Sequence, residues 1–340
     1  MVACGSDHVS KQHYKGIIRM RIAKPSIIIT CLVFLLSLAT VNAVADHHAK
    51  PKSVLVTGAT TGIGRNLAER LASNGYHVYA GARTDDEMAE LNAQENMTAV
   101  RLDVTKQEQI DAAYELIQKS GTGLYALVNN AGIGGGGPVV ETPIDEQNIV
   151  YQVNVEGVYR VTKTLAPLII ESKGRISTTG SVAGTITTSS YNAYSGSKHW
   201  IEAFTDGLAL EMADKGVMVS VIEPGAYQTH IRRNTMLREF ENIKKRGGTV
   251  TDEMKKQYEQ TAAYELSLKK PDAVSDAFMH ALFDDKPLRR YVVTPNQEEQ
   301  AFTIYTKVQQ LVELNQWGPH SYSRDQLLGM LDKALAEKAK

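Results

Sequence analysis

Cysteine is almost absent from this 340-residue sequence. The two cysteines, Cys4 and Cys31, lie close to the N-terminus. A framework of disulfide bonds is therefore excluded for the rest of the chain, whose stability must come from a buried apolar core. A length of 340 residues is sufficient for one or two such cores.

Several other features are missing. Lysine and arginine (37 together) do not outnumber aspartate and glutamate (38), so a nucleic-acid partner is not indicated. Low-complexity sequence is limited to the glycines at positions 134–137, and a composition of 43% hydrophobic and 22% charged residues is typical of a globular protein. The histidines at positions 47, 48, 199 and 230 lack the spacing of metal ligands, so no metal site is expected.

The N-terminal segment differs in kind from the rest of the chain. Five basic residues between positions 11 and 24 precede an uncharged apolar run at 27–39, and Ala43 and Ala45 then form the small-x-small pattern that signal peptidases cleave. Residues 1–45 are predicted to be an export signal that is cleaved after Ala45, leaving residues 46–340. If translation starts at Met20, residues 1–19 are an upstream extension.

An uncleaved membrane anchor is the alternative, because the uncharged stretch at 25–45 approaches the ~20 residues that cross a bilayer. In both interpretations the basic flank stays in the cytoplasm, which places the remainder in a periplasmic, luminal or secreted location. Loss of the leader would change the formal net charge from −1 to about −5.

From residue 53 onward, short β-branched runs alternate with longer amphipathic stretches. Helices are predicted to start at Ile63, Lys106, Asp145, Tyr191 and Asp272. Strands are predicted at residues 54–57, 77–80, 98–102, 126–129, 175–178, 217–222 and 291–293. This alternation indicates parallel βαβ units, so we predict one doubly wound α/β domain with helices on both faces of a parallel sheet.

Two segments fall outside this alternation. The charged residues 230–270 favour helix and follow the sixth strand, where such a fold closes over its ligand, so they form a candidate substrate lid. Residues 297–340 are predicted to be terminal helices with a break at Trp317, Gly318 and Pro319. We therefore expect the core of the domain at 52–296 and a C-terminal helical extension at 297–340.

A glycine-rich turn follows the first predicted strand. It runs from Gly58 through Thr60, Gly62 and Ile63 to Gly64, and it opens a helix. Glycines at such a turn let the backbone approach a pyrophosphate, whose charge is favoured by the helix N-terminus. Glycines also end strands for structural reasons, but the position between a strand and a helix favours a dinucleotide site.

The end of the second predicted strand bears on the choice of cofactor. A site that prefers NAD usually has an acid there to bind the ribose 2′-hydroxyl, whereas this strand ends at Arg83. A guanidinium can pair with a 2′-phosphate, so NADP(H) is predicted over NAD(H). Arg65 is either a second candidate for this contact or a solvated helix residue, and the nearby Asp85 and Asp86 weigh against the prediction.

Tyr194 and Lys198 carry the strongest catalytic signal. Their spacing of four residues on a predicted helix places the phenol and the ammonium on one face. A positive neighbour stabilises phenolate and lowers the tyrosine pKa, as required of a group that exchanges protons near neutral pH. Tyr191 is either a substrate contact or a structural tyrosine at the start of the same helix.

These motifs are part of an ordered set across residues 52–294 that resembles the short-chain dehydrogenase/reductase family. The other members are an Asp-Val pair, an Asn-Asn-Ala-Gly motif, a helix asparagine, a serine and a Pro-Gly-x-x-x-Thr motif. They fall on Asp103 and Val104; on Asn129, Asn130, Ala131 and Gly132; on Asn154; on Ser181; and on Pro224, Gly225 and Thr229.

The resemblance implies a Rossmann fold, a nicotinamide cofactor and a catalytic group of four residues. Tyr194 would exchange a proton with the substrate oxygen, and Ser181 would hydrogen-bond that oxygen. Lys198 would bind the nicotinamide ribose and lower the Tyr194 pKa, and Asn154 would hold a water that links the lysine to solvent. Thr229 would contact the nicotinamide carboxamide. The rest of the cofactor would be bound by the glycine turn and by Arg83, Asp103, Val104, Asn130, Ala131, Gly132, Pro224 and Gly225.

The resemblance also bears on substrate and assembly. Residues 271–294 look like those of the retinol and hydroxysteroid dehydrogenase branch, which implies a lipophilic alcohol, ketone or aldehyde. A 3-oxoacyl thioester reductase is the main enzymatic alternative, and a sensor that binds NADP(H) without turnover is an alternative from another class. The family further implies a homodimer or homotetramer formed by paired helices, one of which carries Tyr194.

Overall fold

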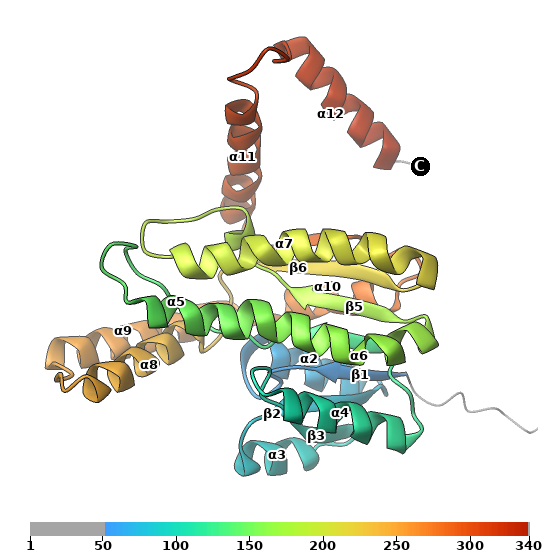
Figure 1. Ribbon diagram of the computed structural model, residues 1–340, viewed down its shortest axis with the longest axis vertical. Coiled ribbons are helices and arrows are strands. Elements are labelled where there is room, and N and C mark those ends of the chain that lie inside the picture. Colours follow the sequence, from blue (N-terminus) through green and yellow to red (C-terminus); the bar gives the residue numbers. More distant parts are fainter. Residues whose placement is uncertain (1–51, 339–340) are drawn as a thin grey trace, which may run out of the picture. The chain divides into compact units, whose positions relative to one another are not determined.

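The computed structural model describes residues 52–338 of the chain (Figure 1). The predicted leader at residues 1–45 lies outside this range. Seven parallel strands form one sheet in the order β3-β2-β1-β4-β5-β6-β7, which confirms the predicted doubly wound α/β fold. The strands are β1 (Ser53–Val56), β2 (His77–Ala82), β3 (Met97–Arg101), β4 (Ala126–Asn129), β5 (Arg175–Thr179), β6 (Met218–Pro224) and β7 (Arg290–Val293).

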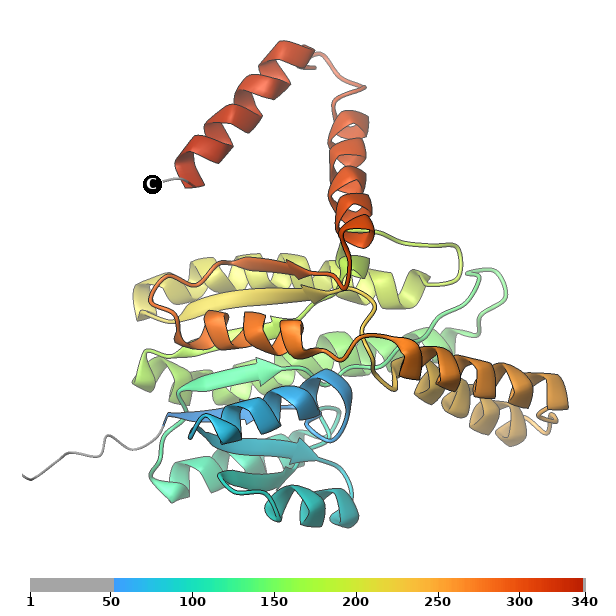
Figure 2. The same ribbon diagram turned by 180° about the vertical axis from the view of Figure 1, so that it is seen from behind.

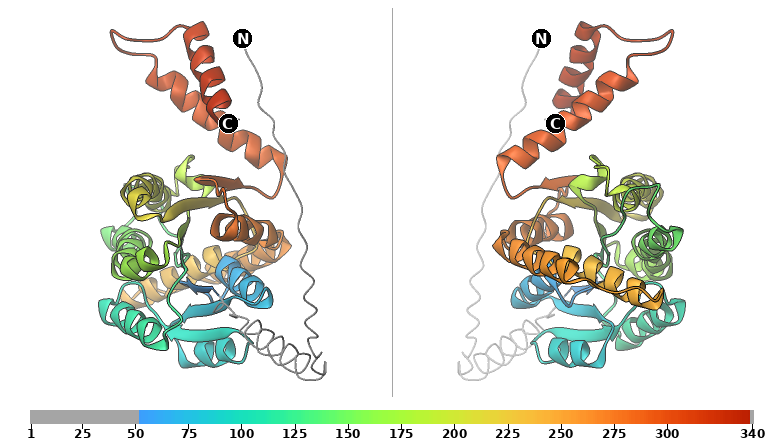
Figure 3. Two further views of the ribbon diagram at one scale, coloured as in Figure 1. Left: turned by 90° about the vertical axis from the view of Figure 1, so that its right-hand side faces the viewer. Right: turned by 90° about the vertical axis from the view of Figure 1, so that its left-hand side faces the viewer.

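Helices cover both faces of this sheet, as Figures 2 and 3 show. Three of them pack on each face. Those on the first face are α2 (Gly62–Ser73), α3 (Asp85–Asn92) and α10 (Asp272–Phe283), and those on the second are α4 (Gln107–Ser120), α6 (Val158–Ser172) and α7 (Asn192–Met212). In β1, Val54 and Val56 belong to the first apolar core and Leu55 to the second. The strands are almost continuously apolar because both of their faces are buried.

Two helical features differ from the sequence prediction. Helix α3 (Asp85–Asn92) was not predicted, because it buries only Leu91 and so has no apolar stripe. Instead, a capping box marks its start, in which Thr84 and Glu87 bond to each other's backbone N–H. The helix predicted from Asp145 is interrupted: a π-helical stretch, η1 (Gln152–Gly157), joins α5 (Ile144–Tyr151) to α6.

The predicted lid is a pair of helices, α8 (Ile231–Lys245) and α9 (Asp252–Ser267), which lie side by side in Figure 1. They leave the domain after β6 and return to it before α10. The two ends of this excursion meet, because the Gln228 N–H donates a hydrogen bond of 2.8 Å to the Lys269 carbonyl. The lid is therefore an insertion with a closed base.

The predicted terminal helices are α11 (Gln297–Leu314) and α12 (Arg324–Lys338). Helix α11 buries Thr303, and its Gln310 side chain donates a hydrogen bond of 3.0 Å to the Thr185 carbonyl. Helix α12 buries none of its residues. Within residues 52–338, no helix is long and apolar enough to span a bilayer.

Candidate active site

A pocket of about 960 Å³ lies where the strand order reverses, beside β1 and β4. Ligand sites of doubly wound sheets form at this point, outside the carboxyl ends of the strands. All but two of the predicted site residues line the pocket. The exceptions are Gly64, the last residue of the glycine turn, and Asn154, which lies in η1.

The glycine turn joins β1 to α2 and forms one wall of the pocket. Gly58 and Gly62 have φ angles of +63° and +58°, a backbone region that favours glycine. A side chain at Gly64 would collide with the Gly58 carbonyl and with the amide nitrogen of Asn130. The turn is thus compact enough for a phosphate to approach the backbone at the N-terminus of α2.

Asn130 braces this turn. Its side-chain nitrogen donates to the carbonyls of Thr57 (3.0 Å) and Gly58 (3.1 Å), and its side-chain oxygen accepts from the Thr179 hydroxyl (3.2 Å). The Thr57 hydroxyl in turn accepts the N–H groups of Asn130 and Ala131, each at 2.9 Å. The side chain of Asn130, which was predicted to bind cofactor, is therefore committed to holding the turn against β4.

The end of β2 presents Arg83 to the pocket. The Arg83 guanidinium makes no hydrogen bond or ion pair with any residue of 52–338, although its backbone bonds to Arg101 and Glu87. Asp85 is paired with Arg101, which holds this acid away from the pocket. Arg65, the second candidate, lies outside the pocket lining and pairs with Glu69 and with Glu90.

Asp103 and Val104 form the neighbouring wall, after β3. One carboxylate oxygen of Asp103 accepts the N–H (2.9 Å) and the hydroxyl (2.7 Å) of Thr105, which fixes the side chain. Val104 packs against the backbone of Gly157 in η1, where an added Cβ would lie 2.6 Å from a Val104 methyl group. Both residues are therefore held rigidly beside the pocket.

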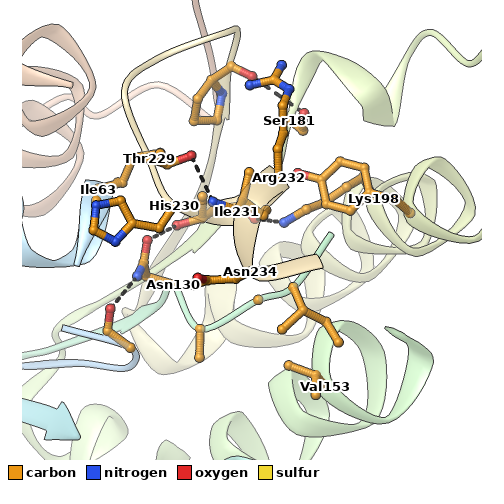
Figure 4. A pocket seen from close by; sticks show the side chains of 18 of the residues that line it. Ile63, Asn130, Val153, Ser181, Lys198, Thr229, His230, Ile231, Arg232 and Asn234 are labelled. Atoms are coloured by element: carbon orange, nitrogen blue, oxygen red, sulfur yellow. Dashed lines mark hydrogen bonds between the residues drawn. The ribbon is translucent and has the colours of Figure 1, made fainter. Parts of the chain in front are cut away.

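Tyr194 and Lys198 lie one turn apart on α7 and line the pocket with Ser181. Figure 4 shows Lys198 and Ser181 in the wall of the pocket. Lys198 is only 5% exposed, and its ammonium donates a hydrogen bond of 2.7 Å to the Thr179 carbonyl. The Lys198 Nζ lies 5.6 Å from the centroid of the Tyr194 ring. Ser181 precedes the short helix η2 (Val182–Gly184), and its hydroxyl accepts the Ala183 N–H at 3.1 Å.

The pKa of Tyr194 differs from the prediction. Burial raises the pKa of the phenol to about 12, against the opposing effects of a hydrogen bond with Ser181 and of the charge on Arg232. Burial also lowers the pKa of Lys198 to about 8, against the charge of Glu202. The expected lowering of the tyrosine pKa by Lys198 is thus wrong for this structure, because burial dominates and the ammonium bonds to Thr179.

Asn154 lies in the π-helical stretch η1 and links two walls of the site. Its side chain accepts from the Ile133 N–H and donates to the Ile133 carbonyl, both at 2.9 Å, and also donates to the Ser197 hydroxyl at 3.0 Å. Ser197 donates onward to the Tyr194 carbonyl at 2.7 Å. Asn154 therefore fixes the position of α7 relative to the segment after β4. Irregular π-turns inside helices frequently occur at functional sites.

A buried acidic cluster behind Lys198 was not predicted. Glu202 lies one turn after Lys198, and Glu223 is the residue before Pro224 and is 2% exposed. Arg290 of β7 contacts Glu202 at 3.0 Å and Glu223 at 3.7 Å. Burial and the neighbouring Glu202 raise the pKa of Glu223 to about 7, whereas Arg290 opposes this rise. The partners are far apart in the sequence, so only the four-residue step from Lys198 to Glu202 could have indicated the cluster.

Glu299 is a second pocket residue that the sequence did not reveal. It comes from the first turn of α11 and accepts the Ala226 N–H at 2.9 Å. The segment that Glu299 holds contains the predicted cofactor residues Pro224, Gly225 and Thr229. Thr229 lies over the glycine turn, where an added Cβ on Gly62 would be 3.3 Å from the Thr229 side chain.

Helix α8 of the lid forms one wall of the pocket. Helix α8 is fastened to the loop after β4 by Arg238, which donates a hydrogen bond of 2.6 Å to the Gly134 carbonyl. It is fastened to α5 by Asn242, which donates to Glu146 at 2.5 Å. Gly134 and Gly135 allow this approach, since added side chains there would meet Thr235 and Arg238 of the lid.

Apolar side chains face this part of the pocket. They are contributed by α5, η1, the segment after β5 and the lid, and they are Ile149, Val153, Ile186 and Leu237. Tyr191 also lines the pocket and packs edge-on against Tyr194, with ring centroids 5.3 Å apart. The position of Tyr191 allows a substrate contact as well as support for Tyr194.

Known proteins share this sequence pattern and fold. The profile of the short chain dehydrogenase family matches residues 52–239. The uncharacterized oxidoreductase YbbO of Escherichia coli is 35% identical over 245 residues, which cover 72% of this chain and 86% of YbbO. Retinol dehydrogenase 16 of Rattus norvegicus is 33% identical over 261 residues, which cover 72% of this chain and 81% of that protein.

A solved structure supports the match in three dimensions. A variant of actinorhodin polyketide ketoreductase, crystallised with NADPH, superimposes with a TM-score of 0.59 and 26% identity, covering 72% of this chain and 96% of that one. Among the structures of this fold, some hold NADP and others NAD. The family match over residues 52–239 and the likeness to these relatives show that the chain belongs to the short-chain dehydrogenase family of oxidoreductases.

Proposed function

We propose that the protein is an NADP(H)-preferring oxidoreductase that interconverts an alcohol with a ketone or aldehyde. One observation carries the proposal: the Tyr194 phenol and the Ser181 hydroxyl line the same pocket as the glycine turn at Gly58 and Gly62. A carbonyl group beside Tyr194 and Ser181 is therefore within reach of a dinucleotide that lies along the turn.

The residues of the pocket fit such a dinucleotide. The backbone cradle at Gly64 has no room for a side chain, and the N-terminus of α2 favours a phosphate. Lys198 and Thr229 would hold the nicotinamide half, and Asp103 and Val104 the adenine half. The bound cofactor supplies or accepts the hydride.

Tyr194 moves the proton in this mechanism. In the reducing direction its hydroxyl donates a proton to the carbonyl oxygen, and in the oxidising direction the phenolate accepts the proton of the alcohol. Ser181 donates a hydrogen bond to the same oxygen, where negative charge develops. The raised pKa keeps the phenol protonated near neutral pH, which favours its action as a donor in reduction.

The preference for NADP(H) rests on Arg83. Its guanidinium lines the pocket and forms no ion pair among residues 52–338, although its charge helps to lower the pKa of the nearby Glu87. A 2′-phosphate would supply a direct partner. Asp85, the acid that could have competed for this position, is paired with Arg101.

The substrate is proposed to have a lipophilic body, as retinoids and steroids do. The apolar side chains at Ile149, Val153, Ile186 and Leu237 support this, and so does the likeness to a protein named retinol dehydrogenase 16. A 3-oxoacyl thioester reductase would instead prefer thioester-linked substrates. A sensor would bind NADPH without turning over any compound.

Location and assembly complete the proposal. Residues 1–45 are proposed to direct export, either as a cleaved signal or as a membrane anchor, and the enzyme is proposed to be a homodimer or homotetramer. A reporter fused after residues 20–60 should reach the far side of the membrane. A reporter that stays in the cytoplasm would contradict export.

The decisive experiment measures turnover of the purified protein with NADPH and with NADH. Substrates would include retinal, steroid ketones, simple aldehydes and 3-oxoacyl thioesters, and the Tyr194→Phe variant would be measured alongside. We expect turnover with NADPH that falls by roughly 10²- to 10⁴-fold in the variant. Binding of NADPH with no turnover of any compound would support the sensor instead.

A further inference from the structure

Arg232 is a cationic side chain placed at the reacting end of the pocket. It lies in the first turn of α8, lines the pocket and is half-buried. Figure 4 shows Arg232 on the same side of the pocket as Ser181 and away from Ile63 of the glycine turn. Its charge also lowers the pKa of Tyr194. Arg232 therefore lies close to Tyr194 and Ser181 rather than to the glycine turn.

The guanidinium of Arg232 has no acidic partner within residues 52–338, unlike the other arginines of the same helix. Arg233 pairs with Glu265 at 3.3 Å, and Arg238 lies 3.9 Å from Glu146. Of the acids that line the pocket, Asp103 is bonded to Thr105 and Glu299 to the Ala226 N–H. The positive charge at Arg232 is thus available to a ligand.

The lid holds Arg232 in this position. Its backbone N–H donates to the carboxylate of Glu265 at 2.8 Å, and its guanidinium lies 5.4 Å from the centroid of the Tyr264 ring, both on α9. The aromatic face attracts the cation but leaves the N–H groups unbonded. A guanidinium has five N–H donors in a rigid fork that matches a carboxylate in a bidentate manner.

We propose that Arg232 binds a carboxylate that the substrate carries close to its reacting carbonyl, so that the enzyme acts on oxo acids and hydroxy acids with an apolar body. This inference rests on the proposed function and narrows its substrate class. A neutral retinoid, steroid or thioester would leave a half-buried guanidinium without a partner, which is unfavourable in a pocket lined by apolar side chains.

The test compares straight-chain 2-oxo and 3-oxo acids with their methyl esters, which keep the carbonyl and remove the charge. The wild-type protein should show a kcat/KM for at least one acid that is roughly 10- to 100-fold above that for its ester, as expected for a hydrogen-bonded charge. Arg232→Leu should abolish this preference by lowering turnover of the acid alone. Arg232→Lys should restore part of it, since lysine keeps the charge without the fork.

Arg233→Leu is the matched control, because Arg233 is the neighbouring arginine but lies outside the pocket lining. It should keep the preference for the acid. A second measurement needs no variant: a straight-chain fatty acid should inhibit the wild-type enzyme at least about 10-fold more strongly than the corresponding fatty amide. Equal inhibition, or equal turnover of acid and ester, would overturn the role of Arg232.

The outcomes separate this inference from the proposed function. Turnover of neutral esters, aldehydes or thioesters that depends on Tyr194 but shows no preference for acids would refute the Arg232 inference and leave the oxidoreductase standing. Absence of turnover for every compound, with intact NADPH binding, would refute both.

Discussion

The two ends of the pocket differ in how their polar groups are used. At the cofactor end, the side chains of Asn130 and Thr57 form their hydrogen bonds with other residues of the protein. Among the described arginines of that end, Arg83 is the one whose side chain forms no such bond and can bind a ligand. At the substrate end, Tyr194, Ser181 and Arg232 gather around an apolar wall with few bonds of their own. The cofactor end is therefore preorganised for one class of ligand. At the substrate end, the ligand must supply the hydrogen-bond partners of the polar side chains.

The largest effect should come from breaking the preformed end. In Gly64→Ala the new methyl group would collide with backbone and with Asn130, so we expect loss of NADPH binding and a large fall in Tm. Gly207→Ala is the control, because Gly207 lies in α7 with no atom near its Cβ position, and it should be neutral or stabilising. Cofactor titration and thermal melts measure both. Unchanged binding in Gly64→Ala would show that the turn is not a rigid cradle.

Arg83→Ala tests the arginine at the cofactor end that forms no ion pair among the described residues. The KM for NADPH should rise by about 10-fold while that for NADH stays nearly constant, because only NADPH has the 2′-phosphate. Arg65→Ala should leave both values unchanged, since Arg65 is engaged with Glu69 and Glu90. Equal changes for the two cofactors would refute the assignment of Arg83.

Glu223→Gln tests the buried charge behind the catalytic lysine through the pH dependence of stability. Folding raises the pKa of Glu223 from 4.5 to about 7, because the buried site favours the protonated carboxyl. The contribution of Glu223 to folding stability is therefore fully present below pH 4.5 and is lost as the pH rises through 7. The wild type should therefore lose on the order of 2–4 °C more in Tm between pH 5 and pH 8 than the variant does. The exposed Glu253→Gln should keep the wild-type slope, and a variant slope equal to that of the wild type would contradict the shift.

The smallest effect is expected from removing α12. Ending the chain at residue 322 should change Tm by less than about 1 °C, because α12 buries nothing. Ending it at 296 removes the buried Thr303 and the contact of Glu299 with Ala226, so turnover and Tm should both fall. A large fall in Tm on ending the chain at residue 322 would mean that α12 has a partner outside the described residues.

Local patterns in the sequence could predict one part of the structure, and contacts between distant residues could not be predicted. The strands and the motifs at their carboxyl ends are local patterns, so the sheet was predicted and nearly all of the predicted site residues line the pocket. Other lining residues, such as Ile149 and Ile186, were not singled out from the sequence. Helix α3 has one buried residue and was missed, although Thr84 and Glu87 form a capping box that could have indicated it. The contacts of Glu202 with Arg290 and of Glu299 with Ala226 join residues 88 and 73 positions apart, and no local pattern encodes them.

The hydrogen bond that closes the base of the lid separates changes in substrate selectivity from changes in the catalytic residues. Because Gln228 and Lys269 are bonded to each other, the part of the lid that makes no contact with the rest of the domain can be lengthened, shortened or replaced without moving the strands on either side. The proton-transfer residues and the glycine turn lie outside that interval, whereas Thr229, Arg232 and Leu237 lie inside it. Exchange of the part of this segment after Thr229 between relatives would transfer selectivity for the substrate and leave Tyr194, Lys198 and Ser181 in place.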